Sequence, residues 1–220
     1  MRQEENNRPR GTSRQLATVT AITCARAPMV LLSMVGVAVD MLWPDWLAAR
    51  GFAIPLRVGC LALMALSAIT DLFDGMFARK WNVTSKFGAI CDPLMDKVFF
   101  VVVFPTVTAM LFLVGDVGQG VLMLFFTVLH VLRDLWVVTL RSLAVGKADM
   151  RANFVGKLRT FVSFPIGMLV YAHVAFSWPW LPRGAMVALE TLGIALNLYS
   201  LVVYTKRYGF AVKDAINSEK

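Results

Sequence analysis

Residues 70–97 read TDLFDGMFARKWNVTSKFGAICDPLMDK, and this stretch joins two long apolar segments. Its carboxylates form two pairs, Asp71 with Asp74 and Asp92 with Asp96. Residues three or four apart lie on the same face of a helix, so each pair shares a face. If residues 79–87 turn the chain back, the two faces oppose each other. Four carboxylates then converge near membrane depth, where a single ionised carboxylate is costly.

This acidic cluster predicts a divalent metal centre. Carboxylates held close together repel one another, and a hard divalent cation with oxygen ligands relieves that repulsion. Mg²⁺ usually keeps coordination positions for substrate phosphates, so we expect two Mg²⁺ ions, with Mn²⁺ as the alternative, clamping a diphosphate. Gly75 and Gly88 remove side chains beside the cluster, so a ligand can approach closely. The planar guanidinium of Arg79 can grip a phosphate there.

The rest of the chain has the composition of a membrane protein. Of its 220 residues, 58% are hydrophobic and 16% are charged, whereas soluble domains are usually ~45–50% apolar and ~25% charged. A spanning helix needs ~20 residues, and in hydrocarbon the backbone must satisfy its own hydrogen bonds. We therefore predict an all-α integral membrane protein with six transmembrane helices. Their apolar segments are Ala27–Trp43, Ile54–Thr70, Val98–Val114, Val121–Leu140, Phe161–Phe176 and Met186–Tyr204.

The basic residues predict which side of the membrane each end occupies. Six spans put both termini on one side, and 17 of the 22 Lys and Arg residues lie on that side. The opposite side holds only Arg50, Arg57 and Arg183. By the positive-inside rule both termini are cytoplasmic, as is the acidic cluster, in the inner or plasma membrane of the cell. This basic face suits anionic lipid headgroups and phosphorylated substrates, and the sequence carries no motif for binding nucleic acid.

The polar ends of the chain flank the membrane domain. We predict a disordered basic tail over residues 1–14, with a short helix after it that leads into the membrane. The six-helix domain covers residues 15–208, and a polar C-terminal tail covers residues 209–220.

A second set of basic residues predicts a pocket for an acceptor phosphate, formed by Arg133, Arg141, Lys157 and Arg159. Arg133 lies within an apolar segment, where arginine normally faces the protein interior or a wet cavity. Its neighbour Asp134 is expected to be a poor partner, because adjacent residues do not face each other on a helix. The alternative is that Lys157 and Arg159 are ordinary anchoring charges of the cytoplasmic face. His130 is expected to be a hydrogen-bonded core residue.

The acidic stretch resembles the signature of the CDP-alcohol phosphotransferase family, D-x-x-D-G-x-x-A-R-x8-G-x3-D-x3-D. The fixed positions are met by Asp71, Asp74, Gly75, Ala78, Arg79, Gly88, Asp92 and Asp96. The resemblance implies a six-helix membrane fold, often homodimeric, with a site open to the cytoplasm. It also implies two divalent cations held by the four aspartates, with Asp96 as general base. The resemblance further implies that the other signature residues, together with Ser85, bind the CDP-lipid. These other residues are Gly75, Ala78, Arg79 and Gly88.

Other segments resemble the phosphatidylglycerophosphate synthase branch of that family. They are the pairing R-[DE]-x6-R from Arg133, the run G-K-x-[KR]-T from Gly156, and Thr23-x-x-Arg26 near the N-terminus. Thr23 and Arg26 are thereby implied to contact the CDP-lipid, although Val19–Thr20 stands where the branch usually has Pro-Asn. The branch implies transfer of a phosphatidyl group from CDP-diacylglycerol to glycerol 3-phosphate.

Two kinds of alternative stay open. A cardiolipin synthase or a phosphatidylinositol-phosphate synthase has the same core and differs in the acceptor pocket. A non-catalytic cation transporter could use the same aspartates, but an ion path needs polar residues that continue to the far side. Here the acids stop in the cytoplasmic half, and the path leaves Gly75 and Arg79 unexplained.

Overall fold

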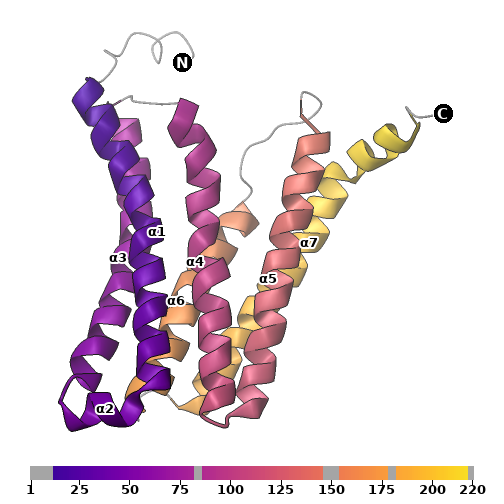
Figure 1. Cartoon of the computed structure of the whole chain (residues 1–220). Helices are drawn as coiled ribbons and strands as arrows, with labels where there is room; N and C mark the ends of the chain where they lie inside the picture. The colour runs from indigo at the N-terminus through magenta and orange to yellow at the C-terminus, as the bar shows by residue number, and fades with distance from the viewer. Residues whose placement is uncertain (1–11, 82–85, 146–153, 178–181, 218–220) are drawn as a thin grey trace. The chain divides into compact units, whose positions relative to one another are not determined.

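The computed structural model describes residues 12–81, 86–145, 154–177 and 182–217, and all the regular secondary structure in these ranges is helical (Figure 1). Within these ranges, some helical residues, most of them in α3 and α4, are described by their backbone alone. The helices are α1 (Ser13–Leu42), α2 (Pro44–Ala49), α3 (Ala53–Trp81), α4 (Lys86–Leu113), α5 (Val117–Leu143), α6 (Phe154–Phe176) and α7 (Arg183–Asn217). The all-α prediction is therefore confirmed for this part of the chain.

Helix α1 begins earlier than the first apolar segment. Thr12 and Gln15 form a capping box, in which each side-chain oxygen accepts a hydrogen bond from the other residue's backbone N–H, at 3.3 and 2.8 Å. Such a box satisfies two of the N–H groups that a helix start leaves unpaired. The helix then passes Pro28 without ending. The expected entry helix and the first apolar segment are thus one helix of 30 residues.

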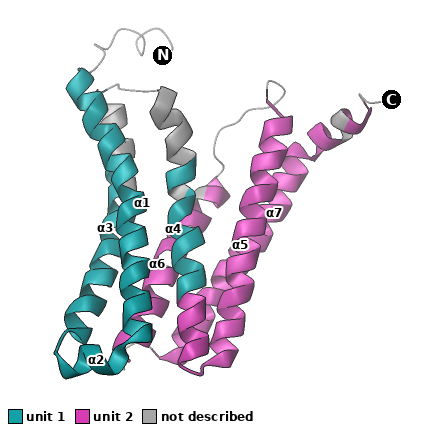
Figure 2. Ribbon diagram, in the orientation of Figure 1, with its two compact units in different colours: residues 1–106 teal, residues 107–220 magenta. Residues whose placement is uncertain are grey.

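The chain divides into two compact units, Met1–Thr106 and Val107–Lys220 (Figure 2). In the first unit, α1 packs along α3. Gly36 permits this close packing, because a Cβ there would lie 2.5 Å from the sulfur of Cys60. Near the end of α1, Asp40 pairs with Arg57 of α3 at 2.8 Å.

In the second unit, α7 packs along both α5 and α6. One buried cluster there comprises Val137, Leu140, Ala144, Tyr204, Tyr208 and Ala211. Gly193 of α7 lets the helices approach, because a Cβ at that position would lie 2.5 Å from the ring of Phe126. Helix α7 continues to Asn217, so residues 209–217 of the predicted tail are helical.

Five described helices are long and apolar enough to cross a membrane: Ser13–Leu42, Ala53–Thr70, Val117–Leu143, Phe154–Phe176 and Arg183–Val212. Within α4, Lys97–Leu113 is a shorter apolar helical segment. Large apolar side chains such as Leu32, Phe125 and Tyr199 are exposed on these helices. Apolar side chains that face outward along such helices suit contact with lipid, so the chain is an integral membrane protein.

Candidate functional site

The helices carry both pairs of aspartates as the sequence predicts. Helix α3 continues to Trp81 and includes Asp71 and Asp74, and α4 begins at Lys86 and includes Asp92 and Asp96. Each pair therefore has the helical spacing that shares a face. The side chains of the four aspartates lie outside the described residues, as do Gly75, Ala78, Arg79, Ser85 and Gly88 of the implied CDP-lipid site. That the four carboxylates converge on a metal ion therefore stays a prediction.

The two implied contacts near the N-terminus lie on α1. Thr23 and Arg26 are both buried, and their spacing of three residues places them on one face of the helix. The hydroxyl of Thr23 donates to the backbone oxygen of Val19 at 3.2 Å.

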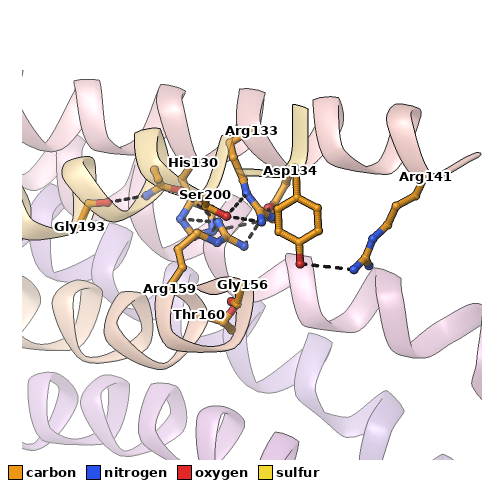
Figure 3. A network of polar contacts seen from close by, with 11 residues as sticks. His130, Arg133, Asp134, Arg141, Gly156, Arg159, Thr160, Gly193 and Ser200 are labelled. Atoms are coloured by element: carbon orange, nitrogen blue, oxygen red, sulfur yellow. Dashed lines mark hydrogen bonds and ion pairs between the residues drawn. The ribbon is translucent and has the colours of Figure 1, made fainter. Parts of the chain in front are cut away.

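Three of the four residues predicted to bind the acceptor phosphate come together in the second unit: Arg133, Arg141 and Arg159 (Figure 3). Arg133 on α5 is buried, and its Nη1 contacts Oδ1 of Asp134 at 2.9 Å. The Nη2 of Arg159, on α6, contacts the same carboxylate oxygen at 2.8 Å. Arg133 also donates through Nε to the hydroxyl of Ser200 on α7 at 3.0 Å. One carboxylate thus joins guanidinium groups from two helices.

The expectation that Asp134 is a poor partner for Arg133 is wrong. The rule for adjacent residues describes where their Cβ atoms point, and the long arginine side chain can bend back beyond that direction. A buried guanidinium without a partner is strongly destabilising, so a carboxylate one residue away is a favourable partner despite the spacing.

His130 is a further buried member of this network. Its side chain is buried, and Nη1 of Arg159 lies 3.1 Å from His130 Nε2 and 3.2 Å from the amide oxygen of Asn197. A guanidinium can only donate, so the ring nitrogen that it contacts acts as an acceptor. The ring also packs edge-on to Phe126. The prediction of a hydrogen-bonded core histidine is confirmed.

Tyr204 of α7 contacts both Arg133 and the third arginine, Arg141, and so links Arg141 to the cluster. The guanidinium carbons of Arg133 and Arg141 lie 4.8 and 5.2 Å from the centre of its ring, within the range of cation–π attraction. Arg141 also donates from Nη2 to the Tyr204 hydroxyl at 3.4 Å. On α6, a Cβ at Gly156 would lie 2.7 Å from that hydroxyl, so glycine leaves the space that the tyrosine fills.

The sequence analysis missed the α7 side of this network. Asn197, Ser200 and Tyr204 are separated by three and four residues, so they share one face of the last apolar helix. Polar residues at helical spacing inside an apolar segment are the signal that could have found them. Lys157, the fourth predicted residue, lies on α6, and its side chain is outside the described part of the chain.

The cluster has the charge and the donors to bind an anion. Two guanidinium groups contact the single carboxylate of Asp134, and a third, that of Arg141, joins the cluster through Tyr204, which leaves an excess of positive charge. The Nε atoms of Arg141 and Arg159 are buried with no hydrogen-bond partner among the described residues. Buried donors normally have partners, so two unfilled ones mark a place for an acceptor group. The forked geometry of arginine matches the oxygens of a phosphate or carboxylate.

Comparison with known proteins shows the family that the chain resembles. The model of the CDP-alcohol phosphatidyltransferase family matches residues 17–202. A CDP-diacylglycerol–glycerol-3-phosphate 3-phosphatidyltransferase of Cereibacter sphaeroides is 34% identical over 125 residues, which cover 54% of this chain and 48% of that protein. A protein of Mycobacterium tuberculosis described as a probable phosphatidylglycerophosphate synthase is 36% identical over 157 residues, 69% of this chain and 66% of that protein. The chain thus spans less than two thirds of the length of these two relatives. A CDP-diacylglycerol–glycerol-3-phosphate 3-phosphatidyltransferase of Pectobacterium atrosepticum is 30% identical over 152 residues, 66% of this chain and 75% of that protein.

Proposed function

The chain belongs to the CDP-alcohol phosphatidyltransferase family, and on that premise we propose that it transfers a phosphatidyl group from CDP-diacylglycerol to glycerol 3-phosphate. The products are phosphatidylglycerol phosphate and CMP. The observation that carries the choice of acceptor is the arginine cluster, in which Arg141 and Arg159 each have a buried Nε donor with no partner in the described part of the chain. The names of the relatives from C. sphaeroides and P. atrosepticum contain the same donor and acceptor.

The charge of the cluster favours a phosphomonoester as acceptor. A phosphomonoester carries about −1.5 to −2 charges at neutral pH and offers three strong acceptor oxygens. Asp134 already neutralises part of the positive charge of Arg133 and Arg159. A group that binds to the same two guanidinium groups must therefore be strongly anionic. Glycerol 3-phosphate meets this requirement, whereas serine carries no phosphate and phosphatidylglycerol carries a singly charged phosphodiester.

The reaction is a displacement at the β-phosphorus of CDP-diacylglycerol. Asp96 accepts the proton of the acceptor hydroxyl, and the hydroxyl oxygen forms a bond to that phosphorus. The bond from the phosphorus to the bridging oxygen breaks, and CMP leaves with the electron pair. General-base assistance is typically worth ~10²–10⁴ in rate, so positioning of the two substrates must contribute much of the remainder.

Four carboxylates in two face-sharing pairs are the oxygen donors that Mg²⁺ prefers, so Asp71, Asp74, Asp92 and Asp96 fit a two-ion centre. When bound, the ions neutralise the charge of the diphosphate. Gly75, Ala78, Arg79, Ser85 and Gly88, together with Thr23 and Arg26 on α1, hold the CDP-lipid.

The orientation follows from the distribution of Lys and Arg. With α4 counted as a span, the chain crosses the membrane six times and both termini are cytoplasmic. The active site then opens to the cytoplasm from the inner or plasma membrane. We also propose that the protein acts as a homodimer, as members of this family often do.

A CMP-release assay on the purified chain tests the proposal. The assay contains CDP-diacylglycerol and Mg²⁺, with glycerol 3-phosphate, phosphatidylglycerol, inositol 1-phosphate or serine as acceptor. We expect CMP release with glycerol 3-phosphate. Release with phosphatidylglycerol alone, or with inositol 1-phosphate alone, would show that this compound is the acceptor. The proposed transfer from CDP-diacylglycerol would then still hold. No release with any acceptor, together with metal-ion flux into proteoliposomes, would favour the cation transporter.

A further inference from the structure

Helices α5 and α7 carry a second buried polar contact, far from the arginine cluster along both helices. Gln119 lies in the first turn of α5 and Glu190 in the second turn of α7. Their side chains are 1% and 0% exposed, and Nε2 of Gln119 donates to Oε1 of Glu190 at 3.1 Å. Arg133 follows Gln119 by 14 residues on α5, which is about 21 Å along a helix. The contact is therefore separate from the acceptor pocket.

The remaining oxygen of each side chain lacks a hydrogen-bond partner among the described residues. Glu190 Oε2 and Gln119 Oε1 are both buried, and neither has a hydrogen bond among the described residues. Both atoms are acceptors when the carboxyl is ionised, so neither can satisfy the other. Two unsatisfied oxygens on residues already joined by one hydrogen bond indicate that a shared donor is missing between them.

Among the residues that the structure describes, no charged group at this end of the helices pairs with Glu190. Arg183, at the start of α7, pairs with Asp116 at the cap of α5, and both are more exposed than Glu190. Asp116 also accepts a hydrogen bond from the backbone N–H of Gln119 at 3.2 Å. It adds negative charge beside Glu190. Helix α6, which also packs against α7, carries His173 in its last turn, and no described contact joins this histidine to Glu190.

We propose that Glu190 and Gln119 form a buried proton site, in which Glu190 is held as a carboxylic acid. The acid O–H donates to the amide oxygen of Gln119, while the amide N–H donates to the other oxygen of Glu190. One proton thereby satisfies both orphaned oxygens and closes a ring of two hydrogen bonds. It also removes a charge whose burial inside a membrane span is costly. The result is a neutral link that holds α5 against α7.

Infrared spectroscopy of the full chain in lipid nanodiscs tests this site directly. The wild-type protein at neutral pH should show the C=O stretch of a protonated carboxylic acid, and Glu190→Gln should remove it from the difference spectrum. Glu190→Gln should also keep the wild-type melting temperature, because a second amide can form the same two hydrogen bonds with Gln119. Asp45→Asn, at an exposed carboxylate near the start of α2, is the control, and it should leave the acid band unchanged.

A second variant keeps the test decisive if Glu190→Gln does not fold. In Gln119→Leu the acid remains but loses its amide partner, so the acid band should move to higher frequency. A wild-type spectrum in which Glu190 contributes a carboxylate stretch, with or without dependence on Na⁺ or K⁺, overturns the proposal. So does an acid band that neither variant changes. None of these readouts depends on transferase activity.

Discussion

The hydroxyl of Tyr204 occupies the space that a side chain at Gly156 would need. A Cβ at residue 156 would lie 2.7 Å from the tyrosine oxygen, which is closer than real Cβ contacts come. The same tyrosine ring contacts the guanidinium groups of Arg133 and Arg141. The glycine on α6 therefore sets the position of the aromatic ring between two arginines of the candidate acceptor pocket.

This relationship predicts that Gly156→Ala impairs the protein and that Tyr204→Phe suppresses the defect. The added methyl group displaces the hydroxyl, and overpacking of a buried site typically costs ~1–3 kcal/mol. Removing the hydroxyl leaves ring carbons 3.6 Å from the new Cβ, which is ordinary contact. The measurements are the melting temperature and the KM for glycerol 3-phosphate.

Tyr208→Phe is the matched control for that suppression. Tyr208 stacks on Tyr204 and is also buried, but the close contact with residue 156 belongs to the Tyr204 hydroxyl. Combined with Gly156→Ala, the control should leave the defect in place. The steric explanation fails if Gly156→Ala with Tyr204→Phe is as impaired as Gly156→Ala alone.

The sequence predicted the helices well, because helical period and apolar length are local properties. It predicted a separate entry helix after residue 14, where α1 is one continuous helix from Ser13, because the apolar segment that defined the span begins only at Ala27. Arg133, Arg141 and Arg159 were correctly grouped, because charges inside or beside apolar helices are rare enough to be noticed. The polar residues of α7 that contact these arginines were not predicted. Spacing along the sequence shows which residues lie on one face of a helix, but it does not show which other helix packs against that face.

Asp134→Asn should destabilise the protein strongly. The carboxylate is the ion-pair partner of two buried guanidinium groups, and breaking a buried pair from one side typically costs ~3–5 kcal/mol. Thermal unfolding in one detergent would measure the loss. Asp45→Asn is the control, since Asp45 is an exposed carboxylate near the start of α2 and should have little effect. Equal melting temperatures for the two variants would show that Asp134 does not hold the arginines together.

Asp96→Asn should abolish CMP release and leave folding and membrane insertion intact. The amide cannot take the proton of the acceptor hydroxyl, and loss of general-base catalysis typically costs ~10²–10⁴ in rate. The measurement is CMP release by the purified variant, with a melting curve to establish that it is folded. Turnover at the wild-type rate would rule out Asp96 as the base.

Arg159→Lys should raise the KM for glycerol 3-phosphate and change kcat little. Lysine keeps the positive charge, but its single ammonium group cannot contact Asp134, Asn197 and a phosphate with the fixed fork of a guanidinium. A hydrogen bond to a charged group contributes ~1.5–3 kcal/mol, so we expect a KM increase of roughly tenfold to a hundredfold. Arg50→Lys, an exposed arginine that lies over Trp46 in the first unit, is the control and should leave KM unchanged. A fall in kcat at constant KM would instead place Arg159 in the chemical step and outside the binding of the acceptor.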